Sequence, residues 1–216
     1  MRKLILGLIF LTLVIGALTK SPENTKTPPS EPFKVAHVAP EPLLIFGEER
    51  KPIVAAATKE LRLNRDKIEK ISFYLAKNPG LGKSRVEAYI SLPDDMAPLL
   101  RMRTVYFGDD WVFYDSVKVM VDDNVVYERS FSRADVARDN SSGSVWETAD
   151  FPADPRDLLV LHSIATAKSA TIRFAGREHR HDHEITAKER KDIKRILDAY
   201  EQLRDNLVRK PETTST

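Results

Sequence analysis

Alternation of apolar and polar residues through the middle of the chain predicts a series of β-strands. Strands with an apolar side chain at every second position are expected at residues 71–75, 86–92 and 101–107. A longer strand is expected over 111–121, where Asp115 interrupts an apolar face and indicates a local bend or bulge. Asp122-Asp123-Asn124 predicts a tight turn into a strand over 125–131, because Asp and Asn tolerate a positive φ.

The second half of the chain adds helices to this pattern. Residues 132–144 are polar and predict a mobile loop, followed by strands near 145–148 and 170–174. Between these strands, Asp154 as N-cap and Pro155 in the first turn predict a helix that runs to about residue 167.

The C-terminal helix has the clearest pattern of all. Thr186 and Glu189 form a capping box, which marks the start of a helix of about 20 residues. Apolar residues then recur at spacings of three and four, at Ile193, Ile196, Leu197, Tyr200, Leu203 and Leu207. We expect this stripe to be buried against the sheet, with a detachable interaction helix as the alternative.

Together these elements predict an α+β fold, an antiparallel β-rich domain (a twisted sheet or small sandwich) with the C-terminal amphipathic helix packed on it. The expected organisation is one globular domain over residues 53–210 and a disordered tail over 211–216. Before the domain, residues 22–52 contain seven prolines and predict a linker, since proline lacks the donor that helices and central strands need.

The first 21 residues have the pattern of an export signal. Arg2 and Lys3 precede an apolar run over residues 4–18, which as a helix would be about 22 Å long, short of a hydrocarbon core of about 30 Å. We therefore expect a cleaved signal peptide or, as the alternative, an uncleaved anchor in the inner membrane. In either case the rest of the chain is expected to be exported, to the periplasm or the cell exterior.

Charge and cysteine content narrow the function further. Removing Arg2, Lys3 and Lys20 from the 34 basic residues leaves 31 against 32 acidic residues, so no general attraction to nucleic acid or anionic lipid is expected. We thus expect no nucleic-acid partner, and membrane contact only through the N-terminal segment. The chain has no cysteine, which excludes disulfides, thiolate metal sites and a Cys nucleophile.

Two local motifs carry candidate chemistry. His179, His181 and His183 would share one face of a strand, and imidazole suits Zn²⁺ or Cu²⁺, so they form a candidate metal site. The alternative is a solvated strand end, because no further metal ligand can be assigned. Gly82-Lys83-Ser84 resembles the end of a phosphate-binding loop, but Lys77 occupies the position of the required first glycine, so a turn is the favoured interpretation.

Residues 66–205 also resemble a group of bacterial exported or phage-associated proteins of uncharacterised function. The resemblance lies in residues 106–113, Val145-Trp146-Glu147, residues 172–177 and Ala199-Tyr200-Glu201. It implies an exported domain and no catalytic residue. Because no catalytic constellation is present either, we expect a non-enzymatic module without cofactor that binds a protein or envelope component. The alternative is an envelope hydrolase or metal-dependent enzyme.

Overall fold

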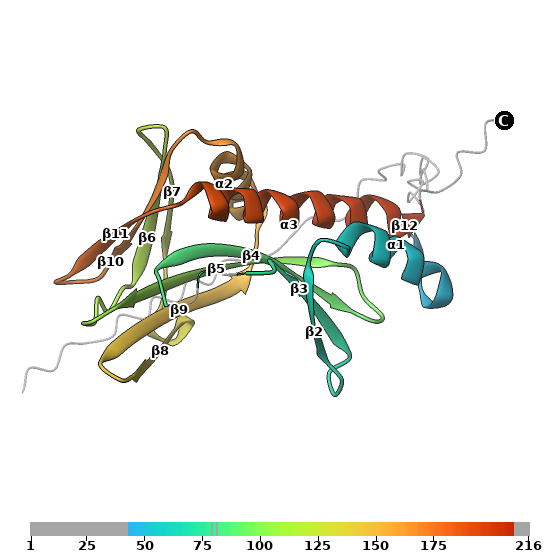
Figure 1. The fold of residues 1–216 in the computed structure, drawn as a ribbon, viewed down its shortest axis with the longest axis horizontal. Coiled ribbons are helices and arrows are strands. Elements are labelled where there is room, and N and C mark those ends of the chain that lie inside the picture. Colours follow the sequence, from blue (N-terminus) through green and yellow to red (C-terminus); the bar gives the residue numbers. More distant parts are fainter. Residues whose placement is uncertain (1–42, 79, 81, 210–216) are drawn as a thin grey trace, which may run out of the picture. The chain divides into compact units, whose positions relative to one another are not determined.

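Two larger antiparallel sheets, a short two-stranded sheet and the helices packed on them make up the computed structural model, which describes residues 43–78, 80 and 82–209 (Figure 1). The larger sheet has the strand order β2-β3-β4-β5-β9-β8. Its strands are β2 (Arg62–Asp66), β3 (Ile71–Leu75), β4 (Arg85–Pro93), β5 (Leu99–Gly108), β8 (Val136–Ser141) and β9 (Ser144–Pro152). The smaller sheet, ordered β11-β10-β6-β7, contains β6 (Ser116–Val121), β7 (Asn124–Ser130), β10 (Ala170–Ala175) and β11 (Arg180–Glu184).

The helices are held together by the longest of them. They are α1 (Arg50–Thr58), α2 (Pro155–Thr166) and α3 (Ala187–Asn206), with short 3-10 turns η1 (Gly47–Glu49) and η2 (Arg133–Asp135). α3 packs on β4 of the larger sheet and contacts both α1 and α2, while α2 reaches β6 of the smaller sheet. Buried residues of both sheets and of α2 and α3 form one hydrophobic cluster, so the described elements share a core.

The α+β fold expected from the sequence is confirmed, and so is the packing of its last helix. α3 begins at the predicted capping box, where the Thr186 hydroxyl accepts the Glu189 N–H and the Glu189 carboxylate accepts the Thr186 N–H. Its stripe is buried as expected, with Ile196 and Leu203 fully enclosed and Leu197 only 2% exposed. The helix is therefore part of the core.

Two other local predictions are also confirmed. Asp122 and Asp123 both have positive φ, 45° and 67°, and form the two-residue turn between β6 and β7. Asp154 caps α2 by accepting the N–H groups of Arg156 and Asp157, and Pro155 occupies the first turn.

The expected strand over 111–121 is wrong in its first half. β6 begins only at Ser116, and residues 111–115 belong to no strand. Here the Glu147 carboxylate accepts the N–H groups of Val112, Phe113 and Tyr114, in place of a neighbouring strand. Phe113 has a φ of 52° and is 57% exposed, which no continuous strand with one buried face would allow.

The prediction of a loop over 132–144 is also wrong. Most of this segment is η2 and β8, and β8 pairs with β9 through a tight turn at Ser142 and Gly143, both with positive φ. β8 is an edge strand with mostly exposed side chains, so its polar sequence fits a strand at the sheet edge.

At the N-terminal side, structure begins within the segment expected to be a linker. β1 (Leu43–Leu44) pairs with β12 (Val208–Arg209), and α1 starts at Arg50. The buried Arg50 guanidinium donates to the main-chain carbonyls of Asp94 and Met96, which fixes α1 to the loop after β4. The predicted signal or anchor, the rest of the linker and the predicted tail, 211–216, lie outside the described residues.

Candidate functional site

Part of strand β4 has a strand partner on only one side. β5 pairs with β4 along the whole stretch from Arg85 to Ser91, whereas β3 pairs with it only from Ile90 to Pro93. Within the described residues, the edge of β4 from Arg85 to Tyr89 is thus left without a strand on the β3 side. A strand edge of this kind presents main-chain N–H and C=O groups that another chain can pair with.

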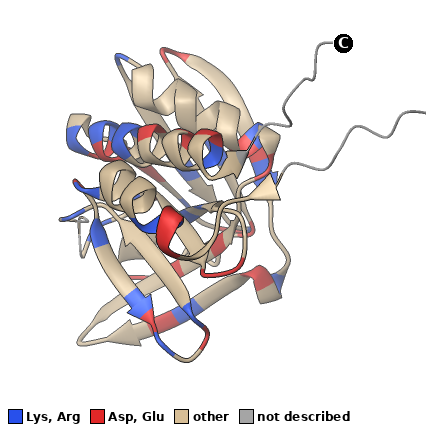
Figure 2. Ribbon diagram, turned by 90° about the vertical axis from the view of Figure 1, so that its right-hand side faces the viewer, with Lys and Arg blue, Asp and Glu red and all other residues tan. Residues whose placement is uncertain are grey.

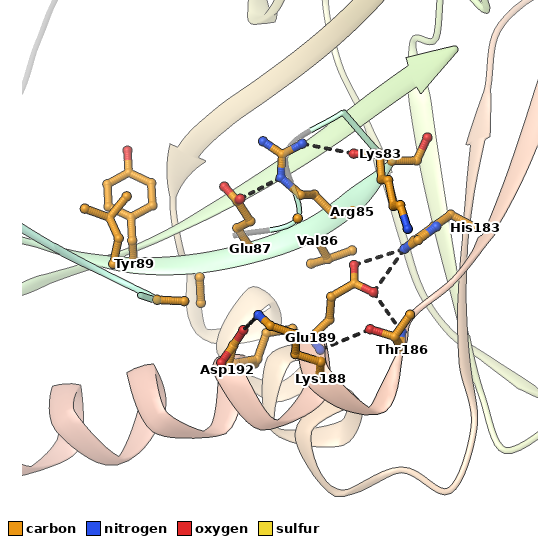
Figure 3. Close-up of a pocket in the computed structure, with 16 residues that line it drawn as sticks. Lys83, Arg85, Val86, Glu87, Tyr89, His183, Thr186, Lys188, Glu189 and Asp192 are labelled. Carbon is orange, nitrogen blue, oxygen red and sulfur yellow. Dashed lines mark hydrogen bonds and ion pairs between the residues drawn. The ribbon is translucent and has the colours of Figure 1, made fainter. Parts of the chain in front are cut away.

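A groove of about 370 Å³ lies along this edge, between β4 and the first turns of α3 (Figure 3). Side chains from both faces of β4 line it, as expected of a cavity at a strand edge. Its aliphatic wall consists of Leu75, Ala76, Val86, Ala88 and Ile193. The volume lies within the range of about 300–1,000 Å³ typical of ligand sites.

One end of the groove is built from the N-terminal turn of α3 and the adjoining strand β11. The Glu189 carboxylate, besides capping the helix, lies 3.0 Å from His183 Nε2. Burial opposes ionisation of this carboxyl, but the hydrogen bonds from His183 and Thr186 outweigh it and hold the pKa of Glu189 below its usual value. The carboxylate is therefore charged and its acceptor capacity is used within the protein.

The acidic side chains along the groove are likewise paired. Glu87 accepts from Arg85 and from Arg103, the latter on the neighbouring strand β5. On α3, Asp192 pairs with Lys188 at 2.6 Å and with Arg195 at 3.0 Å. These contacts leave no acidic group of the described groove lining open to a ligand.

Lys83 is the exception among the charged side chains. It is exposed, and in the part of the chain that the structure describes its amine has no hydrogen-bond or ion-pair partner. In Figure 3 its side chain points down the groove toward His183 and Glu189. The open charge of the groove is thus positive, although acidic and basic residues are interspersed along the helices and strands in the view of Figure 2.

The three histidines expected to share one strand face are only partly brought together. His181 and His183 both lie half-buried on β11, whereas His179 precedes the strand. His181 contacts the rings of Tyr106 and Phe174, and burial together with the neighbouring His183 lowers its pKa. No group of three or more His, Asp or Glu side chains placed to hold a metal occurs in residues 43–78, 80 and 82–209. The metal site stays a prediction.

The Gly82-Lys83-Ser84 segment is the turn that leads into β4. Gly82 has a φ of 69°, which favours glycine, and a strand rather than a helix follows. The Ser84 hydroxyl donates to the Phe107 carbonyl and accepts the Phe107 N–H. The favoured interpretation as a turn is thus confirmed, and its lysine belongs to the groove.

Sequence reasoning missed the groove itself and the role of Glu189 in it. The capping box revealed Glu189 as a helix-start residue, but its contact with His183 depends on the turn between β11 and α3. Sequence reasoning also missed Glu147, which is fully buried and bound by three main-chain N–H groups and by Arg138. The signal that could have marked it is its position between Val145 and Ala149, the apolar residues at alternate positions of the same strand, where an acid is unusual.

Comparisons with protein-family models, curated proteins and solved structures found no match to this chain. Within the described residues, no helix is both long enough and apolar enough to cross a membrane. The geometry of the groove is therefore the basis for the function proposed below.

Proposed function

We propose that this protein is an exported, non-enzymatic binding module that recognises a protein or another component of the bacterial cell envelope through the groove between β4 and α3. The observation that carries the proposal is the open edge of β4 beside an aliphatic wall. Concave, mostly apolar sites with a few polar groups are the usual form of ligand sites.

The groove supports binding better than catalysis. Nucleophilic catalysis requires a nucleophile within hydrogen-bond reach of a base. His183, the histidine among the described lining residues, contacts the Glu189 carboxylate, and the Ser84 hydroxyl is bonded to the main chain of Phe107. For this reason we favour a binding module over the alternative of an envelope hydrolase or metal-dependent enzyme.

Export is supported by the basic pair Arg2-Lys3 and the apolar run over residues 4–18. A fusion of residues 1–52 to a reporter that is active only outside the cytoplasm should give signal. The double substitution Leu8→Arg and Leu11→Arg should abolish it, since each charge costs about 2.5–3.5 kcal/mol in an inserting helix. A fusion that keeps its signal after both changes would contradict export.

Binding in the groove can be tested in cells by site-specific photo-crosslinking. A photoreactive amino acid replaces Gly80 in the groove, where an added side chain meets open space, or, as the control, the exposed Lys168 in the turn between α2 and β10. We expect a discrete adduct from position 80 only, and we expect Ala76→Trp, which adds bulk at a lining position, to suppress it. Equal adducts from both positions, or adducts unaffected by Ala76→Trp, would mean that the groove is not the binding site.

A further inference from the structure

We infer that the groove takes an extended peptide segment of a partner protein, which adds as a strand to the edge of β4 at Arg85–Tyr89 and places a carboxylate opposite Lys83. This inference rests on the proposed function and names the class of ligand. Its support comes from the strand edge, the pattern of the lining and the open charge.

The open edge has the length that strand addition requires. Five residues, Arg85–Tyr89, span about 17 Å at the usual rise per residue, close to the length of a typical strand. No main-chain hydrogen bond joins this stretch to the described residues of the β3–β4 loop. An added strand would supply these partners, and main-chain hydrogen bonds are the source of affinity in this mode of recognition.

The loop between β3 and β4 frames the groove at its other side. The Lys188 amine on α3 donates to the Asn78 carbonyl at 2.6 Å, so the loop is attached to the helix. Ala76 and Gly80 of the loop line the cavity together with Ile193 of the helix. A peptide on the β4 edge would therefore lie between a strand on one side and loop and helix on the other.

The lining predicts an alternating sequence in the peptide. Val86 and Ala88 point to the core side of β4, where Ile193 lies, whereas Arg85 and Glu87 belong to the opposite, polar face. Side chains of an added strand alternate in the same way. Aliphatic residues at every second position would meet the aliphatic wall, and polar residues between them would meet the Arg85–Glu87 pair.

Charge complementarity selects an acidic peptide. Glu87, Glu189 and Asp192 are each paired within the protein, whereas the Lys83 amine has no partner in the described structure. A carboxylate at this end of the groove would be attracted by the Lys83 amine, and an ammonium group there would be repelled by it. The partner segment is thus extended, aliphatic at alternate positions and acidic at one end.

The test uses the full chain, in a mild detergent, and blocked fluorescent peptides of alternating threonine and valine. One peptide ends in glutamate and a second ends in lysine. A third is the glutamate peptide, N-methylated at the amides that would face the edge of β4. We expect the glutamate peptide to bind about tenfold more tightly than the lysine peptide, by fluorescence anisotropy. The N-methylated peptide, which cannot donate these hydrogen bonds, should not bind.

Hydrogen exchange and charge reversal locate the binding. The glutamate peptide should slow amide exchange at Arg85–Tyr89. Lys83→Glu should invert the preference between the glutamate and lysine peptides, while the matched control Lys168→Glu should leave it unchanged. Lys83 is exposed and has no partner in the described residues, so folding should tolerate its substitution.

Several results would overturn the inference. Absence of peptide binding, or slowed exchange elsewhere than in β4, would exclude strand addition. If octanoate binds in the groove and Ala76→Trp blocks it while no peptide binds, the proposed function survives and the peptide inference fails. If the crosslinks at position 80 fail as well, both are wrong. Protection of Arg85–Tyr89 without peptide that is lost on deletion of residues 22–42, or that depends on protein concentration, would identify the chain's own segment or a second copy as the occupant.

Discussion

Two regions of the molecule contain charged side chains but differ in how these are paired. They are the buried Glu147 carboxylate with its partners, here called the Glu147 centre, and the groove between β4 and α3. Glu147 is fully buried and accepts three main-chain N–H groups, from Val112, Phe113 and Tyr114, at 2.7–2.9 Å. The Arg138 guanidinium adds an ion pair at 3.0 Å. In the groove, by contrast, the acids are paired, whereas the Lys83 amine and one edge of β4 have no partner among the described residues. The charge of Glu147 is thus satisfied within the chain, whereas the groove has groups that a ligand can bond.

The difference shows how a charged side chain can be assigned a structural or a binding role. A buried carboxylate whose hydrogen bonds all come from its own chain fixes that chain, here the irregular segment 111–115. An exposed charge beside unpaired main-chain groups contributes little to folding and remains available. Each of these statements predicts the effect of a substitution.

The largest effect is expected from Glu147→Ala. This substitution leaves three main-chain N–H groups, two of them buried, without their acceptor and Arg138 without its ion-pair partner, so the free energy of unfolding should fall by about 3–5 kcal/mol. Denaturant unfolding measures the change. Glu147→Gln, which retains one amide oxygen as acceptor, should cost less than alanine. A loss below about 1 kcal/mol for alanine would show that the centre does not hold segment 111–115 in place.

The rigidity of the groove wall depends on the burial of α3, which Leu197→Ala tests. Leu197 is 2% exposed, and truncating a buried leucine costs about 2–5 kcal/mol. Leu159→Ala on α2, where the leucine is 68% exposed, is the control and should change the free energy of unfolding by less than about 0.5 kcal/mol. Equal melting temperatures for wild type and Leu197→Ala would mean that α3 detaches and that the groove is not preformed.

On the polar face of β4, Tyr89 bonds to side chains of the neighbouring strands, and its contribution to stability should depend on pH. The Tyr89 hydroxyl donates to the Asp150 carboxylate at 2.8 Å and accepts from Arg101 at 2.7 Å. Burial and the hydrogen bond to Asp150 raise the pKa of Tyr89 from 10.0 to about 12. Because the folded-state pKa is the higher one, this stabilisation is complete below pH 10 and is lost as the pH rises through about 12.

Tyr89→Phe removes this pH-dependent contribution, which is about 3 kcal/mol for a shift from 10.0 to about 12. We expect stability to fall less steeply between pH 10 and 12 in the variant than in the wild type, as measured by thermal unfolding at each pH. Part of the slope should remain, because burial also raises the pKa of Tyr114 and of Tyr127. Identical alkaline slopes for the two proteins would refute the raised pKa of Tyr89.

Local signals made α2, α3 and most strands predictable from sequence, whereas α1 was not predicted. Thr186 and Glu189 lie in the same turn, so the start of α3 could be recognised without knowledge of the fold. The conformation of segment 111–115 could not be predicted, because three of its main-chain N–H groups donate to the Glu147 carboxylate, more than 30 residues later in the chain. β8 escaped recognition because an edge strand needs few apolar residues.

The groove was beyond sequence reasoning for a related reason. Its open edge exists because β3 stops pairing with β4 at Ile90, a property of two strands and the loop between them. Alternation along β4 correctly predicted that Val86, Ala88 and Ile90 are buried, but it carries no information about what lies beside the strand. Lys83 attracted attention only through a glycine-lysine-serine motif, and its placement at the groove follows from the turn at Gly82.

The smallest effect on stability is expected at the open charge, with Lys83→Ala. The side chain is exposed and its amine has no partner in the described residues, so the free energy of unfolding should change by no more than about 0.5 kcal/mol. Lys188→Ala is the matched comparison on the opposite wall, since the Lys188 amine bonds both Asp192 and the Asn78 carbonyl at 2.6 Å. That variant should lose somewhat more, about 0.5–1.5 kcal/mol, because it also detaches the β3–β4 loop. Parallel denaturant titrations measure both. If Lys83→Ala proved the more destabilising of the two, Lys83 would have a structural partner, and the contrast between the closed Glu147 centre and the open groove would fail at the residue on which it depends.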